Sequence, residues 1–171
     1  MKKLTIFLLF CYFGFISVQA QSIQLPNACK KLLDKNFRGW KIAEVSKETT
    51  DYHKKRNFPF KPNLIKADWN GDGKTDYAVL IEQGKLRNSQ GKIIGNRRLT
   101  IAFVKSRDGF KHFQIDGGDY IQVFKKGEKD YNYDSQKDFI YKNDSIFVGI
   151  DCCGSSYIWQ KNKFIGFVTS D

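Results

Sequence analysis

The chain has 171 residues, with 29 lysine and arginine residues against 18 aspartate and glutamate residues, and its formal net charge is +11. Hydrophobic residues make up 41% of the chain and aromatic residues 15%, which suffices for the core of one compact domain and argues against a disordered polyampholyte. Three prolines and 14 glycines exclude collagen-like and low-complexity architectures.

The first twenty residues have the pattern of a secretory signal peptide. Lys2 and Lys3 precede an apolar run over residues 4–18, which ends in the cleavage-like tripeptide Val18-Gln19-Ala20. The run is shorter than the roughly 20 residues that a membrane-spanning helix needs. We therefore expect residues 1–20 to be removed by cleavage after Ala20.

Residues 21–171 would then form the exported protein, with 27 basic and 18 acidic side chains and a net charge of +9. This length suits a single domain. No later segment is apolar enough to span a bilayer, so we expect a secreted or periplasmic location and no stable membrane anchor. The positive charge favours an unidentified protein or an acidic surface as partner, although it also serves solubility, and no nucleic-acid partner is expected.

Three cysteines remain after cleavage, and exported proteins retain disulfides. The favoured bridge joins Cys29 to either Cys152 or Cys153, and by chain entropy it would stabilise the fold by about 4 to 5 kcal/mol. A bridge between Cys152 and Cys153 is the alternative, but it would be strained because adjacent Cα atoms lie only about 3.8 Å apart. A catalytic thiol is the third and least favoured interpretation.

The earliest element predicted after the signal segment is one short amphipathic helix over residues 28–37. Cys29, Leu33 and Phe37 recur at helical spacing, and Asn27 precedes them as a candidate cap. From residue 40 onward the pattern becomes strand-like.

The rest of the chain is predicted to be mostly β. Turn-forming residues around Gly109, Asn143 and Asn162 favour antiparallel hairpins over crossover helices, so we expect an α+β fold with an antiparallel meander-like sheet packed on the N-terminal helix. The segments 77–81, 99–104 and 146–150 are apolar on both alternating faces, which predicts central strands. Two basic stretches, 46–63 and 83–98, are predicted as long connections. The candidate strands are 64–67, 77–82, 99–105, 110–115, 120–124, 139–141, 145–151, 157–160 and 164–169.

Residues 68–76, here called the acidic loop, are the most informative part of the chain. Oxygen-bearing side chains occupy its first, third, fifth and ninth positions, and Gly73 allows the backbone to curl around a centre. Ca²⁺ takes about six to eight oxygen ligands, and water could supply those that the protein does not. The candidate ligands are the side chains of Asp68, Asn70, Asp72 and Asp76 and the backbone carbonyl of Lys74.

The spacing matches the opening of an EF-hand loop, but Val79 stands where the bidentate glutamate of that loop is due. Residues 67–79 instead resemble the calcium loop of FG-GAP or VCBS-type repeats, the integrin-type β-propeller units. The resemblance covers a single copy, and it implies a strand-joining loop in which the five candidate residues bind calcium. Residues 152–171 loosely resemble the end of small exported bacterial proteins of unassigned function, which supports one domain and gives no information about activity.

A calcium-free turn is the alternative for the acidic loop, because Asp, Asn and Gly also form tight turns and Lys66 and Lys74 could partly neutralise the carboxylates. The two histidines, His53 and His112, have no metal-binding spacing and are expected at the surface or in turns. No serine-nucleophile elbow, zinc-binding helix, phosphate-binding glycine loop or C-x-x-C pair is present.

These observations favour a non-enzymatic, exported calcium-binding domain that binds another molecule. Two alternatives remain open. A periplasmic inhibitor or immunity-type protein could neutralise a secreted enzyme or toxin through the basic stretches. A calcium-dependent hydrolase would use the cation as a Lewis acid, but the sequence offers no convincing base.

Overall fold

The computed structural model describes residues 23–150 and 153–169, so the expected signal segment and Cys152 lie outside the described residues. The α+β, mostly β class with antiparallel pairing is confirmed. In chain order the elements are α1 (Asn27–Asn36), β1 (Lys41–Ile42), α2 (Lys47–Lys55), β2 (Leu64–Ala67), β3 (Asp76–Arg87), β4 (Ile93–Ser106), β5 (Gly109–Ile115), β6 (Tyr120–Phe124), β7 (Lys129–Asn132), β8 (Lys137–Ile140), β9 (Ser145–Ile150), β10 (Cys153–Gln160) and β11 (Lys163–Thr169).

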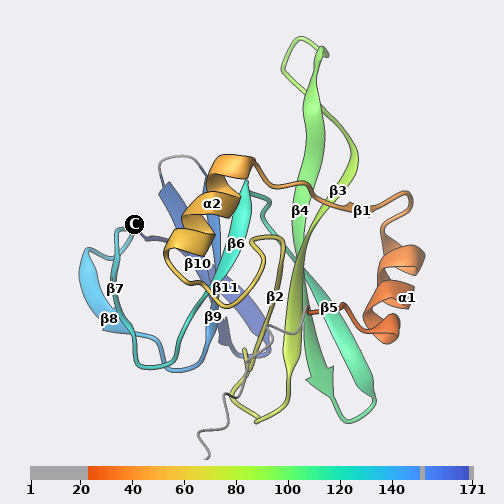
Figure 1. Ribbon diagram of the computed structural model, residues 1–171. Helices are drawn as coiled ribbons and strands as arrows, with labels where there is room; N and C mark the ends of the chain where they lie inside the picture. Colours follow the sequence, from red (N-terminus) through yellow and green to blue (C-terminus); the bar gives the residue numbers. More distant parts are fainter. Residues whose placement is uncertain (1–22, 151–152, 170–171) are drawn as a thin grey trace, which may run out of the picture.

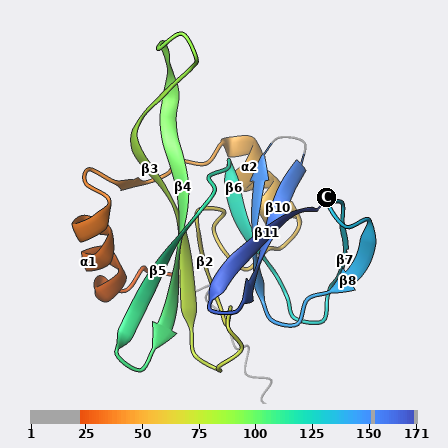
Figure 2. The same ribbon diagram turned by 180° about the vertical axis from the view of Figure 1, so that it is seen from behind.

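The strands form two antiparallel sheets in place of the single sheet that the sequence predicts. The first has the order β1-β3-β4-β5, with β2 also paired to β3, and the second has the order β6-β9-β10-β11-β7-β8. Helix α1 packs on one side of the first sheet and the second sheet lies on the other, as both views show (Figures 1 and 2). The molecule therefore has three layers, with the first sheet in the middle.

The middle position of the first sheet explains why β3 and β4 are apolar on both faces. Val79 and Ile101 face α1 and pack with Leu33, whereas Leu80 and Ala102 pack into the core between the sheets. All five side chains are buried. The prediction of central strands at 77–81 and 99–104 is thus confirmed, and each large buried side chain contributes about 1.5 to 3 kcal/mol.

Helix α1 forms as predicted, but its cap differs. Asn27 is the first residue inside the helix, and Pro26 occupies the cap position without a side-chain hydrogen bond. The Pro26 carbonyl accepts the Lys30 N–H at 3.0 Å, so the first turn closes on a backbone oxygen. The fixed φ of proline sets the direction in which the chain enters the helix.

Both predicted long connections contain regular structure, and the prediction is wrong there. Helix α2 lies within 46–63, and it begins where the Ser46 hydroxyl accepts the Thr49 N–H at 3.1 Å. Its only buried residue is His53, so it lacks the apolar stripe by which a helix is recognised. In 83–98, β3 and β4 continue as a paired ribbon that projects beyond the rest of the molecule (Figure 1).

Candidate functional site

The acidic loop joins β2 to β3, as predicted, and the pairing of Ala67 with Asp76 closes its base. Trp69 is fully buried in the core between the two sheets and anchors the loop. Gly71 and Gly73 have φ angles of 74° and 80°, in the left-handed region that favours glycine. A Cβ atom at Gly71 would lie 2.7 Å from Asn143 Oδ1, so the loop passes close to the second sheet.

The curl predicted from Gly73 is present, and the Asp68 carboxylate lies at its centre. Asp68 Oδ1 accepts the backbone N–H groups of Gly71 at 2.8 Å and Asp72 at 3.1 Å. Its other oxygen, Oδ2, accepts the Gly73 N–H at 2.7 Å, and Asn70 Oδ1 accepts the Asp72 N–H at 3.1 Å. Three consecutive backbone amides thus point inward at one carboxylate.

The Asp76 carboxylate is fully buried at the other end of the loop. Its Oδ2 accepts the Trp69 N–H at 3.0 Å and its Oδ1 accepts the Lys105 N–H at 2.6 Å, which ties the loop to β4. Burial raises the pKa of Asp76 to about 6; the two backbone hydrogen bonds oppose this rise, and the charges of Asp68 and Asp72 add to it. Asp76 is therefore a poorly solvated carboxylate beside two others.

Asp72 is held by Lys74. Its Oδ1 accepts the Lys74 N–H at 2.9 Å, and its Oδ2 accepts a hydrogen bond from Lys74 Nζ at 3.1 Å. These bonds lower the pKa of the Asp72 carboxyl. Lys74 thus supplies the counter-charge on which the calcium-free alternative depends, in addition to the backbone carbonyl that the sequence suggests as a ligand.

The loop brings its oxygen-bearing side chains onto one bend without assembling them into a metal centre. Among residues 23–150 and 153–169, no three histidine, cysteine, aspartate or glutamate side chains are placed so that they could hold a metal ion together. The carboxylates face the protein's own N–H donors instead. Asp68 Oδ2 accepts one such bond and retains a further lone pair, whereas Asp68 Oδ1 already accepts two. The calcium ligand set stays a prediction.

Asp144 was missed by sequence reasoning. It precedes β9 in the second sheet, and its Oδ2 accepts the Asp68 N–H at 3.5 Å and a hydrogen bond from Lys125 Nζ at 3.0 Å. Its Oδ1 accepts the Lys126 N–H at 3.1 Å. The acidic loop therefore touches both sheets, a long-range contact for which the local sequence holds no signal.

Cys29 carries a free thiol, so the predicted bridge from Cys29 to Cys152 or Cys153 is not formed in the structure. Cys29 is fully buried between α1 and the first sheet, whereas Cys153 begins β10 in the second sheet, and the middle layer separates them. Burial raises the pKa of Cys29 to about 12, which keeps the thiol protonated and unreactive at neutral pH.

The two histidines occupy different environments. His112 lies on β5, partly exposed, with its ring edge-on to Phe37 at 5.7 Å between centroids. His53 is only 3% exposed, so the prediction of a surface or turn position is wrong for this residue. No sequence signal marks it, because the helix around it is otherwise polar.

No family model, curated protein or solved structure matches this chain. The resemblance to FG-GAP or VCBS-type loops therefore rests on the residues of the acidic loop alone. Within the described part of the chain, no helix combines the length and apolar character needed to cross a bilayer.

Proposed function

We propose that this protein is an exported, non-enzymatic calcium-binding domain whose acidic loop binds one Ca²⁺ and fastens the two sheets together, so that the domain can bind another molecule. The observation that carries the proposal is the tight bend between β2 and β3, which places the carboxylates of Asp68, Asp72 and Asp76 on one short loop closed by the pairing of Ala67 with Asp76. The buried Asp76 carboxylate closes the opposite end, where it bonds to the backbone of Trp69 and Lys105.

The charges in the loop support a cation as ligand. Three carboxylates lie within nine residues, and Lys74 is the only basic side chain among them. Burial is the main cause of the raised pKa of Asp76, and the charges of Asp68 and Asp72 add to it; a divalent ion would offset those charges. Binding requires the Lys74 ammonium to leave Asp72, so the affinity should be modest. Sites of about 10⁻⁴ to 10⁻³ M still fill where extracellular calcium is plentiful.

Isothermal titration of residues 21–171 with Ca²⁺ tests the proposal, with Mg²⁺ as a second titrant. The decisive variant is Asp72→Asn, because the amide oxygen can still accept the Lys74 N–H while the negative charge is removed. Asp108→Asn, in the exposed turn between β4 and β5, is the matched control. We expect the wild type and the control to bind Ca²⁺ and Asp72→Asn to bind it at least tenfold more weakly. Equal binding by all three, or no binding by the wild type, refutes the proposal.

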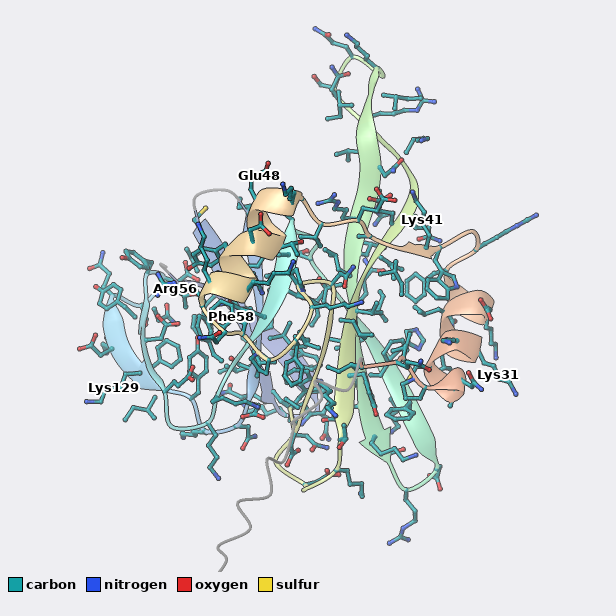
Figure 3. The ribbon with its side chains drawn as sticks, in the orientation of Figure 1. Lys31, Lys41, Glu48, Arg56, Phe58 and Lys129 are labelled. Atoms are coloured by element: carbon teal, nitrogen blue, oxygen red, sulfur yellow. The ribbon has the colours of Figure 1, made fainter. Side chains whose placement is uncertain are left out.

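A second candidate function, that of an inhibitor or immunity-type protein, is favoured by the projecting part of β3 and β4, here called the arm (residues 85–96). Its side chains stand out on both sides (Figure 3). Leu86, Ile93 and Ile94 are 44%, 48% and 58% exposed. Basic side chains accompany them at Lys85, Arg87 and Lys92. Exposed apolar residues among positive charges suit an acidic protein partner, because the charges steer association and the apolar groups gain contact area.

Charge reversal tests this second function. The double variant Arg87→Glu/Lys92→Glu changes only exposed side chains of the arm, and Lys111→Glu on β5 is an exposed control. Acidic proteins of the native envelope should be retained by immobilised wild type and control at low salt and released at high salt. The double variant should retain far less of them. Retention that ignores both salt and charge reversal contradicts this role.

A further inference from the structure

A cavity of about 190 Å³ lies between the end of α2, the segment after it and β6. Its wall is mainly apolar and aromatic, with Phe58, Phe60 and Phe124 among its lining residues, and His53 and Gln122 also line it. A larger cleft of about 570 Å³ adjoins it and shares His53, Phe58 and Phe60. We call the smaller space the His53 cavity.

His53 and Gln122 are the two buried polar residues of this cavity, and three of their side-chain atoms have no hydrogen-bond partner. His53 is 3% exposed and Gln122 is 8% exposed. Neither Nδ1 nor Nε2 of His53 has a partner, and Gln122 Oε1 has none either. Roughly nine in ten buried polar groups in proteins are hydrogen-bonded, so three such atoms at one cavity call for an explanation.

The neighbours of His53 pack against its ring without forming hydrogen bonds to its nitrogens. The rings of Phe58 and Tyr120 lie edge-on to the imidazole, with centroids 4.9 and 5.3 Å away. Burial lowers the pKa of His53, so the ring is neutral at neutral pH and offers one N–H donor and one nitrogen acceptor. The imidazole is thus packed between aromatic rings, and neither of its nitrogens forms a hydrogen bond within the protein.

The charged residues at the cavity are already engaged. Lys125 donates from Nζ to Asp144 Oδ2 at 3.0 Å, and the Glu128 carboxylate accepts the Lys125 N–H at 3.0 Å. His53 and Gln122 are the buried polar residues of the cavity, so an occupant at its inner end meets uncharged polar groups among apolar side chains, whereas Lys125 and Glu128 are exposed. At about 30 Å³ per water the volume equals roughly six waters, which is the size of a molecule with one or two small rings.

We propose that the His53 cavity binds a small, uncharged aromatic molecule carrying a hydroxyl or ring N–H, which hydrogen-bonds to His53 and Gln122 while its ring packs among the three phenylalanines. The three unpartnered atoms and the aromatic wall carry this proposal together. It is independent of calcium binding by the acidic loop, which lies on other residues.

Binding of phenol and indole to residues 21–171 tests the proposal, with benzene and benzoate as comparison probes. The readouts are the imidazole ¹⁵N signals of His53 and the melting temperature. Phenol and indole should shift the His53 signals and raise the melting temperature. Benzene lacks a hydrogen-bonding group and benzoate carries a charge, so both should bind more weakly.

Two variants remove the polar centre separately. His53→Leu and Gln122→Leu should each weaken phenol binding about three- to tenfold, which corresponds to one lost hydrogen bond, without lowering the melting temperature of the unliganded protein. Thr100→Val is the matched control, because Thr100 Oγ1 is also buried without a partner but does not line the cavity. If no probe shifts the His53 signals, ordered water alone fills the cavity and the proposal fails. Equal binding of benzene and phenol, or equal phenol affinity in all variants, also overturns it.

Discussion

Replacing the buried carboxylate of the acidic loop gives the sharpest test of how that loop works. Asp76→Asn preserves the shape of the side chain but leaves one oxygen for two backbone donors, the N–H groups of Trp69 and Lys105. One buried N–H therefore loses a charged acceptor, at a cost of about 1.5 to 3 kcal/mol.

A second effect of Asp76→Asn acts in the opposite direction. Burial raises the pKa of Asp76 to about 6, against an ordinary value of 3.8. At pH 7 and without calcium, the ionised form thus destabilises the folded state by about 3 kcal/mol, and asparagine removes this penalty. The two effects nearly cancel, so the free energy of unfolding of the calcium-free variant should lie within about 2 kcal/mol of wild type.

Calcium should stabilise the wild type much more than it stabilises Asp76→Asn. At a concentration a hundredfold above its Kd, Ca²⁺ stabilises the wild type by about 2.7 kcal/mol, which for a domain of this size corresponds to about 5 to 10 °C in Tm. Asp76→Asn should gain at most a small part of this shift, because the ion loses a charged ligand. Thermal melts at pH 7 with Ca²⁺, with Mg²⁺ and with a chelator measure the difference, and Asp108→Asn serves as control. An equal calcium shift in variant and wild type refutes the role of Asp76, and a calcium-free loss well above 2 kcal/mol refutes the balance of the two effects.

Three further predictions follow from the described contacts. Lys74→Gln should bind Ca²⁺ about two- to fivefold more tightly by titration, since the ion no longer competes with an ammonium for Asp72; weaker binding would favour the calcium-free turn. Burial lowers the pKa of His53, so the unfolded chain takes up a proton at a higher pH than the folded protein, and the stability of the wild type should fall as the pH drops below about 6.5. His53→Leu should remove this part of the pH dependence, and urea unfolding at several pH values measures it. Tyr141→Phe should lower the free energy of unfolding by about 1.5 to 3 kcal/mol in denaturant melts, because the buried Tyr141 hydroxyl donates to the partly buried Asp130 carboxylate at 2.6 Å. A loss below about 1 kcal/mol would mean that this bond contributes little.

The sequence predicts best those elements whose side chains face a core. Strands β2 and β6 have the predicted bounds, because their residues alternate or cluster in the way that burial demands. The bend of the acidic loop was also predictable, since two glycines and an Asp at its start specify the turn locally.

Elements with few buried side chains were not predictable from hydrophobic periodicity. Helix α2 is held by a serine cap and one buried histidine, and the arm consists of strands exposed on both faces. The division into two sheets, the Asp144 contact and the burial of His53 depend on residues far apart in the chain. Such pairings leave no mark in any local window of a single sequence.

The turn at the end of the arm, residues 88–92, joins two strands whose outer parts contact neither core. A break in the chain at this point would leave both sheets and α1 with all their buried contacts. New chain ends, a fluorescent reporter or an affinity tag could therefore be introduced there while the layered body folds as before. The same exposure makes this turn the place where a protease should cleave the native protein first.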